Sequence, residues 1–198
     1  MTSFSDLGVV RPLAQALSHS GFSEPFPIQI ATLPDAIAGR DVLGRGRTGS
    51  GKTLAFALAL LSRLDSRKAK RGKPLALVLS PTRELAMQIN ATISPLARKV
   101  GLSSVLIAGG MPFGKQLQAL EHGVPIVVAT PGRLIDLMHR GALDLSDIEI
   151  TVLDEADLMS DMGFMPAVKE ILDATGRGGQ RLLFSATLDK DVDALVKK

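Results

Sequence analysis

The 198-residue chain has no cysteine, no tryptophan and no tyrosine, and seven phenylalanines are its whole aromatic content. Without cysteine, disulfides and thiolate metal sites are excluded. With so few aromatic rings, a nucleic-acid platform that stacks bases on side chains is not expected. A nucleic acid bound by this chain should therefore be held through its sugar–phosphate backbone.

Long apolar runs are also missing, and the chain does not start with the basic and apolar stretches of a signal peptide. No run approaches the roughly 20 apolar residues of a membrane span. We therefore expect a cytoplasmic protein with no membrane association. The formal charge is +3, from 23 Lys and Arg against 20 Asp and Glu, which permits a polyanionic partner without indicating one.

Short apolar runs alternate with longer segments of helical character. Most of these runs are continuously apolar, as in strands that are buried on both faces. The pattern predicts a single α/β domain, in which a mainly parallel central sheet carries helices on both faces. The six expected strands are residues 41–43, 75–80, 104–110, 125–130, 150–154 and 181–187.

Residues 46–53, GRTGSGKT, fit the pattern G-x-x-x-x-G-K-[ST] between an expected strand and an expected helix. In such a loop the backbone N–H groups point at phosphate oxygens. Lys52 should reach the β- and γ-phosphates, and the Thr53 hydroxyl should bind Mg²⁺. The other expected nucleotide-binding residues of the loop are Arg47, Thr48, Gly49, Ser50 and Gly51.

The run ITVLDEAD ends an expected buried strand with acidic residues. Such residues can hold Mg²⁺ opposite a phosphate loop, which makes Asp154 the second metal candidate. Glu155 is the candidate to orient or deprotonate an attacking water. Asp154, Glu155 and Lys52 form the expected catalytic set.

These motifs stand among others whose order and spacing resemble the DEAD-box RNA helicases, specifically their first RecA-like domain. The resemblance covers nearly the whole chain. It rests on Phe4 as the isolated upstream aromatic, GFSEPFPIQ (21–29) as the Q motif, GRTGSGKT as motif I, PTRELA (81–86) as motif Ia, Gly109 and Gly110 as the paired glycines, TPGR (130–133) as motif Ib, DEAD (154–157) as motif II and SAT (185–187) as motif III.

The resemblance implies that ATP or ADP binds with Mg²⁺, with Gln29 reading the adenine edge and Phe22 stacking on the ring. Without the resemblance, Phe22 would be taken as an ordinary core residue. The resemblance also implies that Ser185 and Thr187 bond Asp157 and couple the nucleotide site to the RNA side.

The resemblance further implies that one RNA strand is held through its phosphates and 2′-hydroxyls, without regard to sequence. Arg83 and Arg133 would supply charge, and Thr82 and Thr130 hydroxyl donors. Without the resemblance, these segments would be helix starts with proline and exposed charge. The remaining RNA-binding candidates are Pro81, Gly109, Gly110, Pro131 and Gly132.

Three positions depart from the family pattern. Phe26 stands where a small hydroxyl residue is usual, so a hydrogen bond inside the Q motif is lost. Gly46 and Arg47 replace Ala-Gln at the start of motif I, with Arg45 adding charge nearby. Leu158 follows DEAD where a basic residue is frequent, which removes one potential contact.

Other features are assigned no site. The basic segment 65–73 is expected to be a solvated loop, with an RNA-contacting patch as the alternative. His19, His122 and His139 lack metal-ligand spacing and are expected at the surface. The methionines that recur every three residues are expected to pack in a helix: Met159, Met162 and Met165.

The resemblance implies that residues 1–198 form one RecA-like domain, with the Q motif at 4–29 and the core at 36–198. A second RecA-like domain, absent from this chain, would supply the cation that the γ-phosphate needs in the transition state. The isolated chain should bind nucleotide with little or no hydrolysis or unwinding, whereas the longer protein would separate RNA duplexes locally with ATP. Two alternatives stay open: a nucleotide-dependent RNA clamp or remodelling module without unwinding, and another P-loop enzyme such as a small-molecule kinase.

Overall fold

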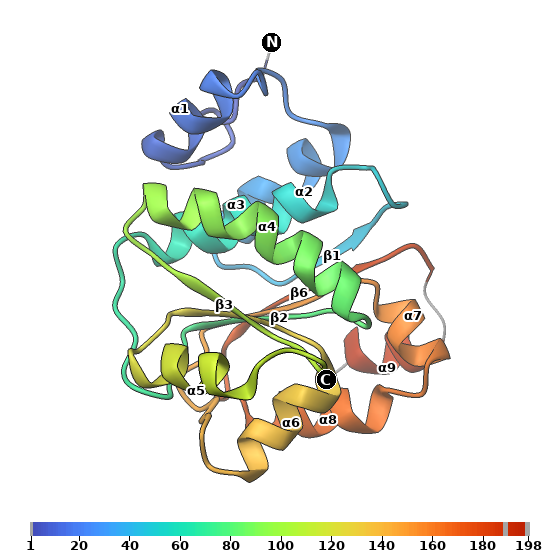
Figure 1. Ribbon diagram of the computed structural model, residues 1–198. Helices are drawn as coiled ribbons and strands as arrows, with labels where there is room; N and C mark the ends of the chain where they lie inside the picture. The colour runs from blue at the N-terminus through green and yellow to red at the C-terminus, as the bar shows by residue number, and fades with distance from the viewer. Residues whose placement is uncertain (1, 188–189, 197–198) are drawn as a thin grey trace.

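A six-stranded sheet with helices on both faces forms the centre of the molecule (Figure 1). The structure is a computed structural model, and of the predicted domain 1–198 it describes residues 2–187 and 190–196. Every strand pairing is parallel, and the strand order is β1-β6-β5-β2-β4-β3. The α/β prediction is confirmed, and the described sheet is parallel throughout. The strands are β1 (Val42–Arg45), β2 (Ala76–Leu79), β3 (Ser104–Ile107), β4 (Ile126–Ala129), β5 (Ile150–Leu153) and β6 (Gln180–Ser185).

All six strands lie where apolar runs predicted them, but three predicted ends are wrong by two or three residues. The third strand was expected to reach residue 110, yet β3 ends at Ile107 because the chain turns away through Gly110, whose φ is +73°. The last was expected to reach residue 187, yet β6 ends at Ser185. In the opposite sense, β1 continues to Arg45 because that residue still pairs with Ser185.

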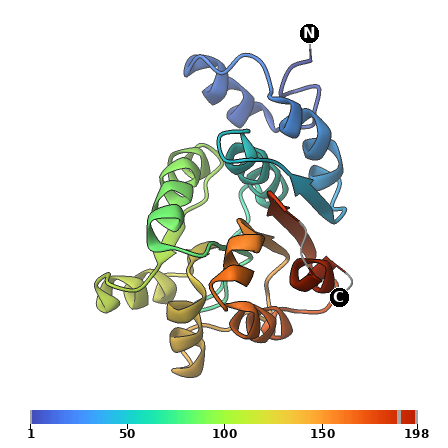
Figure 2. The same cartoon turned by 90° about the vertical axis from the view of Figure 1, so that its right-hand side faces the viewer.

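Two sets of helices cover the two faces of the sheet, and each set packs on its own apolar cluster. One face carries α1 (Arg11–His19), α2 (Pro27–Ile37), α3 (Lys52–Leu64) and α4 (Arg83–Lys99). Figure 2 shows α1, in blue, in the outermost part of this layer, beyond α3. The other face carries α5 (Phe113–Glu121), α6 (Pro131–His139), α7 (Ala156–Asp161), α8 (Met165–Ala174) and α9 (Lys190–Val196).

The strands are mainly apolar because successive side chains point to opposite faces and both faces are covered. In β2, Val78 belongs to the cluster beneath α1–α4, whereas its neighbours Leu77 and Leu79 belong to the cluster beneath α5–α9. Because the strands are parallel, their carboxyl ends share one edge of the sheet. The loops that carry the predicted motifs therefore meet at that edge.

The predicted solvated loop, residues 65–73, is confirmed. It follows α3 and precedes β2, so it lies at the amino edge of the sheet, opposite the predicted motifs. Four of its five cations pair with acidic residues of other segments: Arg67 with Glu149, Lys70 with Asp147, Arg71 with Glu121 and Lys73 with Asp144. This position and pairing argue against the alternative of an RNA-contacting patch.

The predictions for the methionines and histidines have mixed outcomes. Met159 and Met165 are buried, but Met162 is 45% exposed. The prediction that the three methionines pack in a helix is wrong for Met162, because α7 ends at Asp161 and α8 begins only at Met165. The three histidines are exposed, as predicted. Within the described part of the chain there is no metal-binding cluster of His, Cys, Asp and Glu, and no helix is long and apolar enough to cross a membrane.

We predict that Gly44→Ala destabilises the fold by about 1–3 kcal/mol, because a buried ring would have to move. A Cβ at position 44 would lie 2.4 Å from the ring of Phe184. The free energy of unfolding in urea measures the effect. The control is Gly114→Ala in α5, where a Cβ has open space, and it should be neutral or stabilising by up to about 1 kcal/mol. Equal stability of the two variants would contradict this account of β1.

Candidate functional site

A glycine-rich loop joins β1 to α3 at the carboxyl edge of the sheet. Gly49 and Gly51 have φ values of +83° and +89°, which disfavour any residue with a side chain. A Cβ at Gly51 would also lie 2.6 Å from the Phe26 ring, and one at Gly46 would lie 2.7 Å from Ser50 Oγ. The loop therefore depends on its glycines both for conformation and for close packing.

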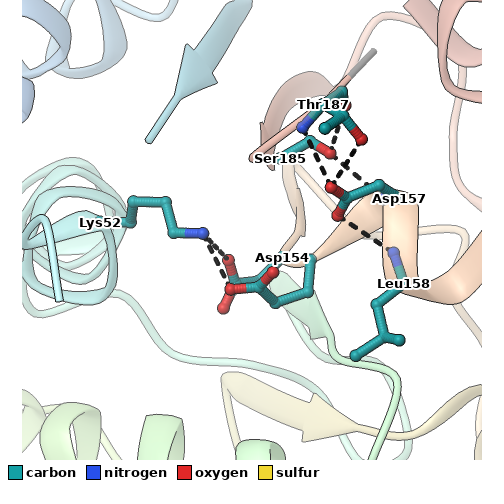
Figure 3. A network of polar contacts seen from close by, with 7 residues as sticks. Lys52, Asp154, Asp157, Leu158, Ser185 and Thr187 are labelled. Atoms are coloured by element: carbon teal, nitrogen blue, oxygen red, sulfur yellow. Dashed lines mark hydrogen bonds and ion pairs between the residues drawn. The ribbon is translucent and has the colours of Figure 1, made fainter. Parts of the chain in front are cut away.

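Lys52, the first residue of α3, faces the end of β5 (Figure 3). Its side chain is only 5% exposed. The ammonium Nζ donates to Glu155 Oε1 at 2.9 Å and lies 3.9 Å from Asp154 Oδ1. A buried ammonium needs opposing anions, and in this structure two carboxylates fill that role. An incoming phosphate group would offer Lys52 a different anion.

Asp154 is a buried carboxylate with spare capacity to bind a cation. Its Oδ1 is buried and has no hydrogen-bond partner among the described residues. Burial raises the pKa of Asp154 to about 6; the Lys52 ammonium opposes this shift, and the charge of Glu155 adds to it. Mg²⁺ takes oxygen ligands, often from only one or two protein groups together with phosphates and water. The carboxylate of Asp154 and the hydroxyl of Thr53 fit this preference.

Glu155 has a backbone conformation that sequence reasoning did not predict. Its φ of 52° and ψ of 49° lie in the left-handed region, and it directly precedes α7. For a residue other than glycine this conformation is costly, and such strain clusters at functional sites. Because the backbone turns sharply after Asp154, two consecutive carboxylates can both approach Lys52.

Asp157 connects the start of α7 to the end of β6 (Figure 3). Its Oδ2 accepts from Thr187 N at 3.0 Å and from Thr187 Oγ1 at 2.9 Å. Ser185 acts differently: its Oγ accepts from the backbone N–H of Asp157 at 3.2 Å and donates to the carbonyl of Thr187 at 2.7 Å. Burial acts to raise the pKa of Asp157, but the contacts with Thr187 and Ser185 outweigh it and lower that pKa. The three predicted coupling residues thus form one network.

Gln29 ties the Q motif to the phosphate loop, a contact that the sequence did not reveal. Its Oε1 accepts from Phe26 N at 2.8 Å, and its Nε2 donates to the carbonyl of Gly51 at 3.2 Å. A carboxamide has two donor hydrogens and two acceptor lone pairs. One of each is left for a base edge, so the predicted role is compatible with the bonds that Gln29 already makes.

Two phenylalanine side chains of the Q motif are about half exposed to solvent. Phe22 is 52% exposed and Phe26 is 50% exposed. The interpretation of Phe22 as a core residue is therefore wrong. Both rings line the same cavity as Gln29, where an exposed ring can contact a ligand.

One cavity of about 730 Å³ brings most of the predicted nucleotide-binding residues together. This volume lies within the usual range for small-molecule sites. Arg47 and Ser50 do not line it, and the cavity also extends along α4 as far as Lys99, which the sequence did not predict. The predicted residues that do line it are Phe22, Gln29, Thr48, Gly49, Gly51, Lys52, Thr53, Asp154 and Glu155.

The predicted RNA-binding segments are neighbours at the same edge. Arg83 Nη1 donates to the carbonyl oxygen of Gly110 at 3.5 Å, and Arg133 Nη1 donates to that of Met111 at 3.4 Å. The loop after β3 thus lies between the two arginines. Each guanidinium has five donors, so several are left for phosphates. Gly109 and Gly132 are exposed.

The two helix N-termini in this region differ in whether a threonine hydroxyl caps them. Thr82 caps α4, since its hydroxyl accepts from Leu85 N at 3.3 Å. Thr130 precedes α6 and makes no such cap. Pro81 and Pro131 are buried. Pro131 is the first residue of α6, whereas Pro81 precedes the Thr82 cap of α4. Their part in RNA contact stays a prediction.

The parallel sheet, the glycine-rich loop and the acidic end of β5 define a RecA-like domain. The family model for DEAD/DEAH box helicases matches residues 26–195, and the chain belongs to that family. This family resemblance was predicted from the motifs and is confirmed.

Curated relatives match the chain along nearly its whole length. It is 44% identical to the ATP-dependent RNA helicase DeaD of Escherichia coli (strain K12), over 100% of this chain and 31% of that protein. It is 43% identical to the mitochondrial DEAD-box ATP-dependent RNA helicase 9 of Arabidopsis thaliana, over 99% of this chain and 32% of that one. The chain therefore spans about a third of the length of these relatives.

Solved structures show the same fold. The RNA helicase Prp28 from Chaetomium thermophilum, bound to ADP, superposes with a TM-score of 0.91 at 40% identity, over 100% of this chain and 48% of that one. A DEAD box protein from Methanococcus jannaschii superposes with a TM-score of 0.90 at 36% identity, over 100% of this chain and 53% of that one. The predicted RecA-like architecture is thus confirmed.

We predict that Asp154→Asn stabilises the protein at neutral pH. Between about pH 4 and 6 the folded state binds the proton of Asp154 more tightly than the unfolded state, so stability rises as pH falls through this window. The ionised carboxylate therefore costs stability above pH 6. The variant should be more stable by roughly 2 kcal/mol near pH 7.5, and the difference should vanish near pH 4.

Urea unfolding of both proteins at the two pH values measures this difference. The matched control is Asp161→Asn at an exposed position, which should change stability by less than about 0.5 kcal/mol. A variant of Asp154 that is less stable than the native protein near pH 7.5 would contradict the account of the buried carboxylate.

Proposed function

We propose that the chain is the first RecA-like domain of an ATP-dependent RNA helicase, which binds ATP or ADP with Mg²⁺ and contacts RNA through its backbone. One observation carries the proposal: in a chain of the DEAD/DEAH box helicase family, the buried Lys52 ammonium pairs with Asp154 and Glu155 in the lining of a ligand-sized cavity. The domain comprises residues 1–198, with the Q motif at 4–29 and the core at 36–198.

Nucleotide binding would change the partners of Lys52. The loop N–H groups and the start of α3 would receive the phosphates, and Lys52 would exchange its contact with Glu155 for one with a phosphate oxygen. Glu155 is then free to orient or deprotonate the attacking water. Bound Mg²⁺, held by Thr53 and Asp154, would supply positive charge to the phosphate oxygens.

The base would lie against the Q motif. Gln29 has one amide hydrogen and one acceptor lone pair left, which suits the paired donor and acceptor of an adenine edge. Phe22 presents an exposed ring to the same cavity. A similar protein, Prp28, has been solved with ADP bound.

RNA would lie along the starts of α4 and α6. Arg83 and Arg133 provide charge there, and the hydroxyl of Thr130 is not used as a cap. Helix N-termini add backbone donors for phosphates. Such contacts do not distinguish bases, so binding should be independent of sequence and sensitive to salt. Asp157 and its network would link this region to the nucleotide site.

A second RecA-like domain is the proposed partner in the longer protein. Phosphoryl transfer in this class needs a further cation on the γ-phosphate, worth about 10³-fold or more in rate. The isolated chain should therefore bind nucleotide but hydrolyse it slowly. Duplex separation by the longer protein would distinguish a helicase from an RNA clamp without unwinding. A cytoplasmic location stays a prediction, since the similar proteins include a mitochondrial one.

We predict that the chain binds Mg·ADP at least about tenfold more tightly than Mg·GDP, a difference of about 1.4 kcal/mol. Gln29→Glu keeps an acceptor for Phe26 N but loses the amide donor, so it should remove most of this preference. Calorimetric titration of both nucleotides measures the effect. The control is Gln118→Glu, an exposed change on α5, which should leave the preference intact.

Two outcomes would contradict the proposal in different ways. Equal binding of the two nucleotides by the native chain would mean that Gln29 does not read the base. No binding of either nucleotide would overturn the proposed function itself.

A further inference from the structure

A short polar row crosses the sheet just beyond the paired ends of its central strands. In register, Leu79 of β2 aligns with Leu153 of β5 and with Ala129 of β4. The ladder continues one step further, because Asp154 N donates to the carbonyl of Leu79 and Ser80 N donates to that of Ala129, each at 3.0 Å. The next residues on these strands therefore lie side by side: Asp154, Ser80 and Thr130.

These three side chains point to the face of the sheet that carries the nucleotide site. Two positions earlier, Val152, Val78 and Val128 all belong to the apolar cluster beneath α1–α4. Side chains two residues apart in a strand share a face. Lys52 of α3 lies on this face and reaches Asp154, which agrees with that placement.

Ser80 is completely buried, and its hydroxyl has no hydrogen-bond partner among the described residues. The same holds for Oδ1 of Asp154, its neighbour in the row. Buried polar atoms are nearly always paired. Two adjacent oxygens that both lack a partner point to a third group that bonds both.

We propose that Ser80 is a positioning residue of the magnesium site, whose hydroxyl holds a water molecule against Oδ1 of Asp154 and so fixes the orientation of that carboxylate. This inference rests on the proposed function, because Asp154 is assigned there to Mg²⁺. Ser80 itself contacts neither the metal nor the nucleotide.

The spacing of the row suits one bridging water. Neighbouring strands lie about 4.8 Å apart, and a water that makes two hydrogen bonds of about 2.8 Å can span that gap. Buried waters typically make about three hydrogen bonds. Ser80 and Asp154 supply two of these partners, and a serine hydroxyl can both donate and accept.

The test separates metal-dependent from metal-independent binding. ADP is titrated by calorimetry into the native chain and into Ser80→Ala, once with excess Mg²⁺ and once with EDTA. Partners that orient metal ligands typically change metal affinity about 10–100-fold. We expect Ser80→Ala to weaken Mg·ADP binding by at least about tenfold and to leave metal-free ADP binding unchanged.

A second readout follows the metal directly. Mn²⁺ replaces Mg²⁺, and electron paramagnetic resonance measures its affinity for the ADP complex, which should fall by the same factor. The control is Ser104→Ala. Ser104 lies at the amino end of β3, at the edge of the sheet away from the row, and its hydroxyl donates to Asn90. It should change neither measurement.

The outcomes separate this inference from the proposed function. Equal loss of ADP affinity with and without Mg²⁺ would show a merely structural effect and overturn the role of Ser80. Unchanged Mg·ADP binding by Ser80→Ala, with a native chain that prefers Mg·ADP, would overturn that role alone. A native chain that binds no ADP would overturn both proposals.

Discussion

The burial of one ammonium group determines the layout of this domain. Lys52 is almost inaccessible to water, and a charge in that position is tolerated only when anions face it. The acidic end of β5 must therefore lie opposite the start of α3. The parallel sheet makes this possible by bringing all carboxyl ends to one edge, and the left-handed backbone at Glu155 brings the second carboxylate to Lys52. The same anion requirement makes the site receptive to phosphate.

Motifs whose residues all lie in one short stretch of sequence could be predicted. A phosphate loop needs its glycines, lysine and threonine in one short stretch, and strands buried on both faces need continuous apolar runs. The sequence therefore predicted the class of fold, the loop, the acidic strand end and the family. It also placed the solvated loop 65–73 correctly, because a charged stretch without apolar periodicity has no core to enter.

Features that depend on distant contacts could not be predicted. The contact between Lys52 and Glu155 joins residues 103 positions apart. Nothing local shows that Gln29 bonds Gly51, that the Phe22 ring is exposed, or that the helix ends before Met162. The row formed by Ser80 and its neighbours exists only because β2 lies between β5 and β4. The order of strands in a sheet cannot be predicted from the apolar sequence of any one strand.

Phosphate should replace the two carboxylates as the partner of Lys52. The most direct test is a crystal structure of this chain with Mn·ADP, with the metal located by its anomalous signal. We expect Nζ of Lys52 to contact a phosphate and no longer Glu155, and manganese to lie between the nucleotide and Asp154. A nucleotide bound elsewhere, with the 2.9 Å contact between Lys52 and Glu155 unchanged, would contradict it.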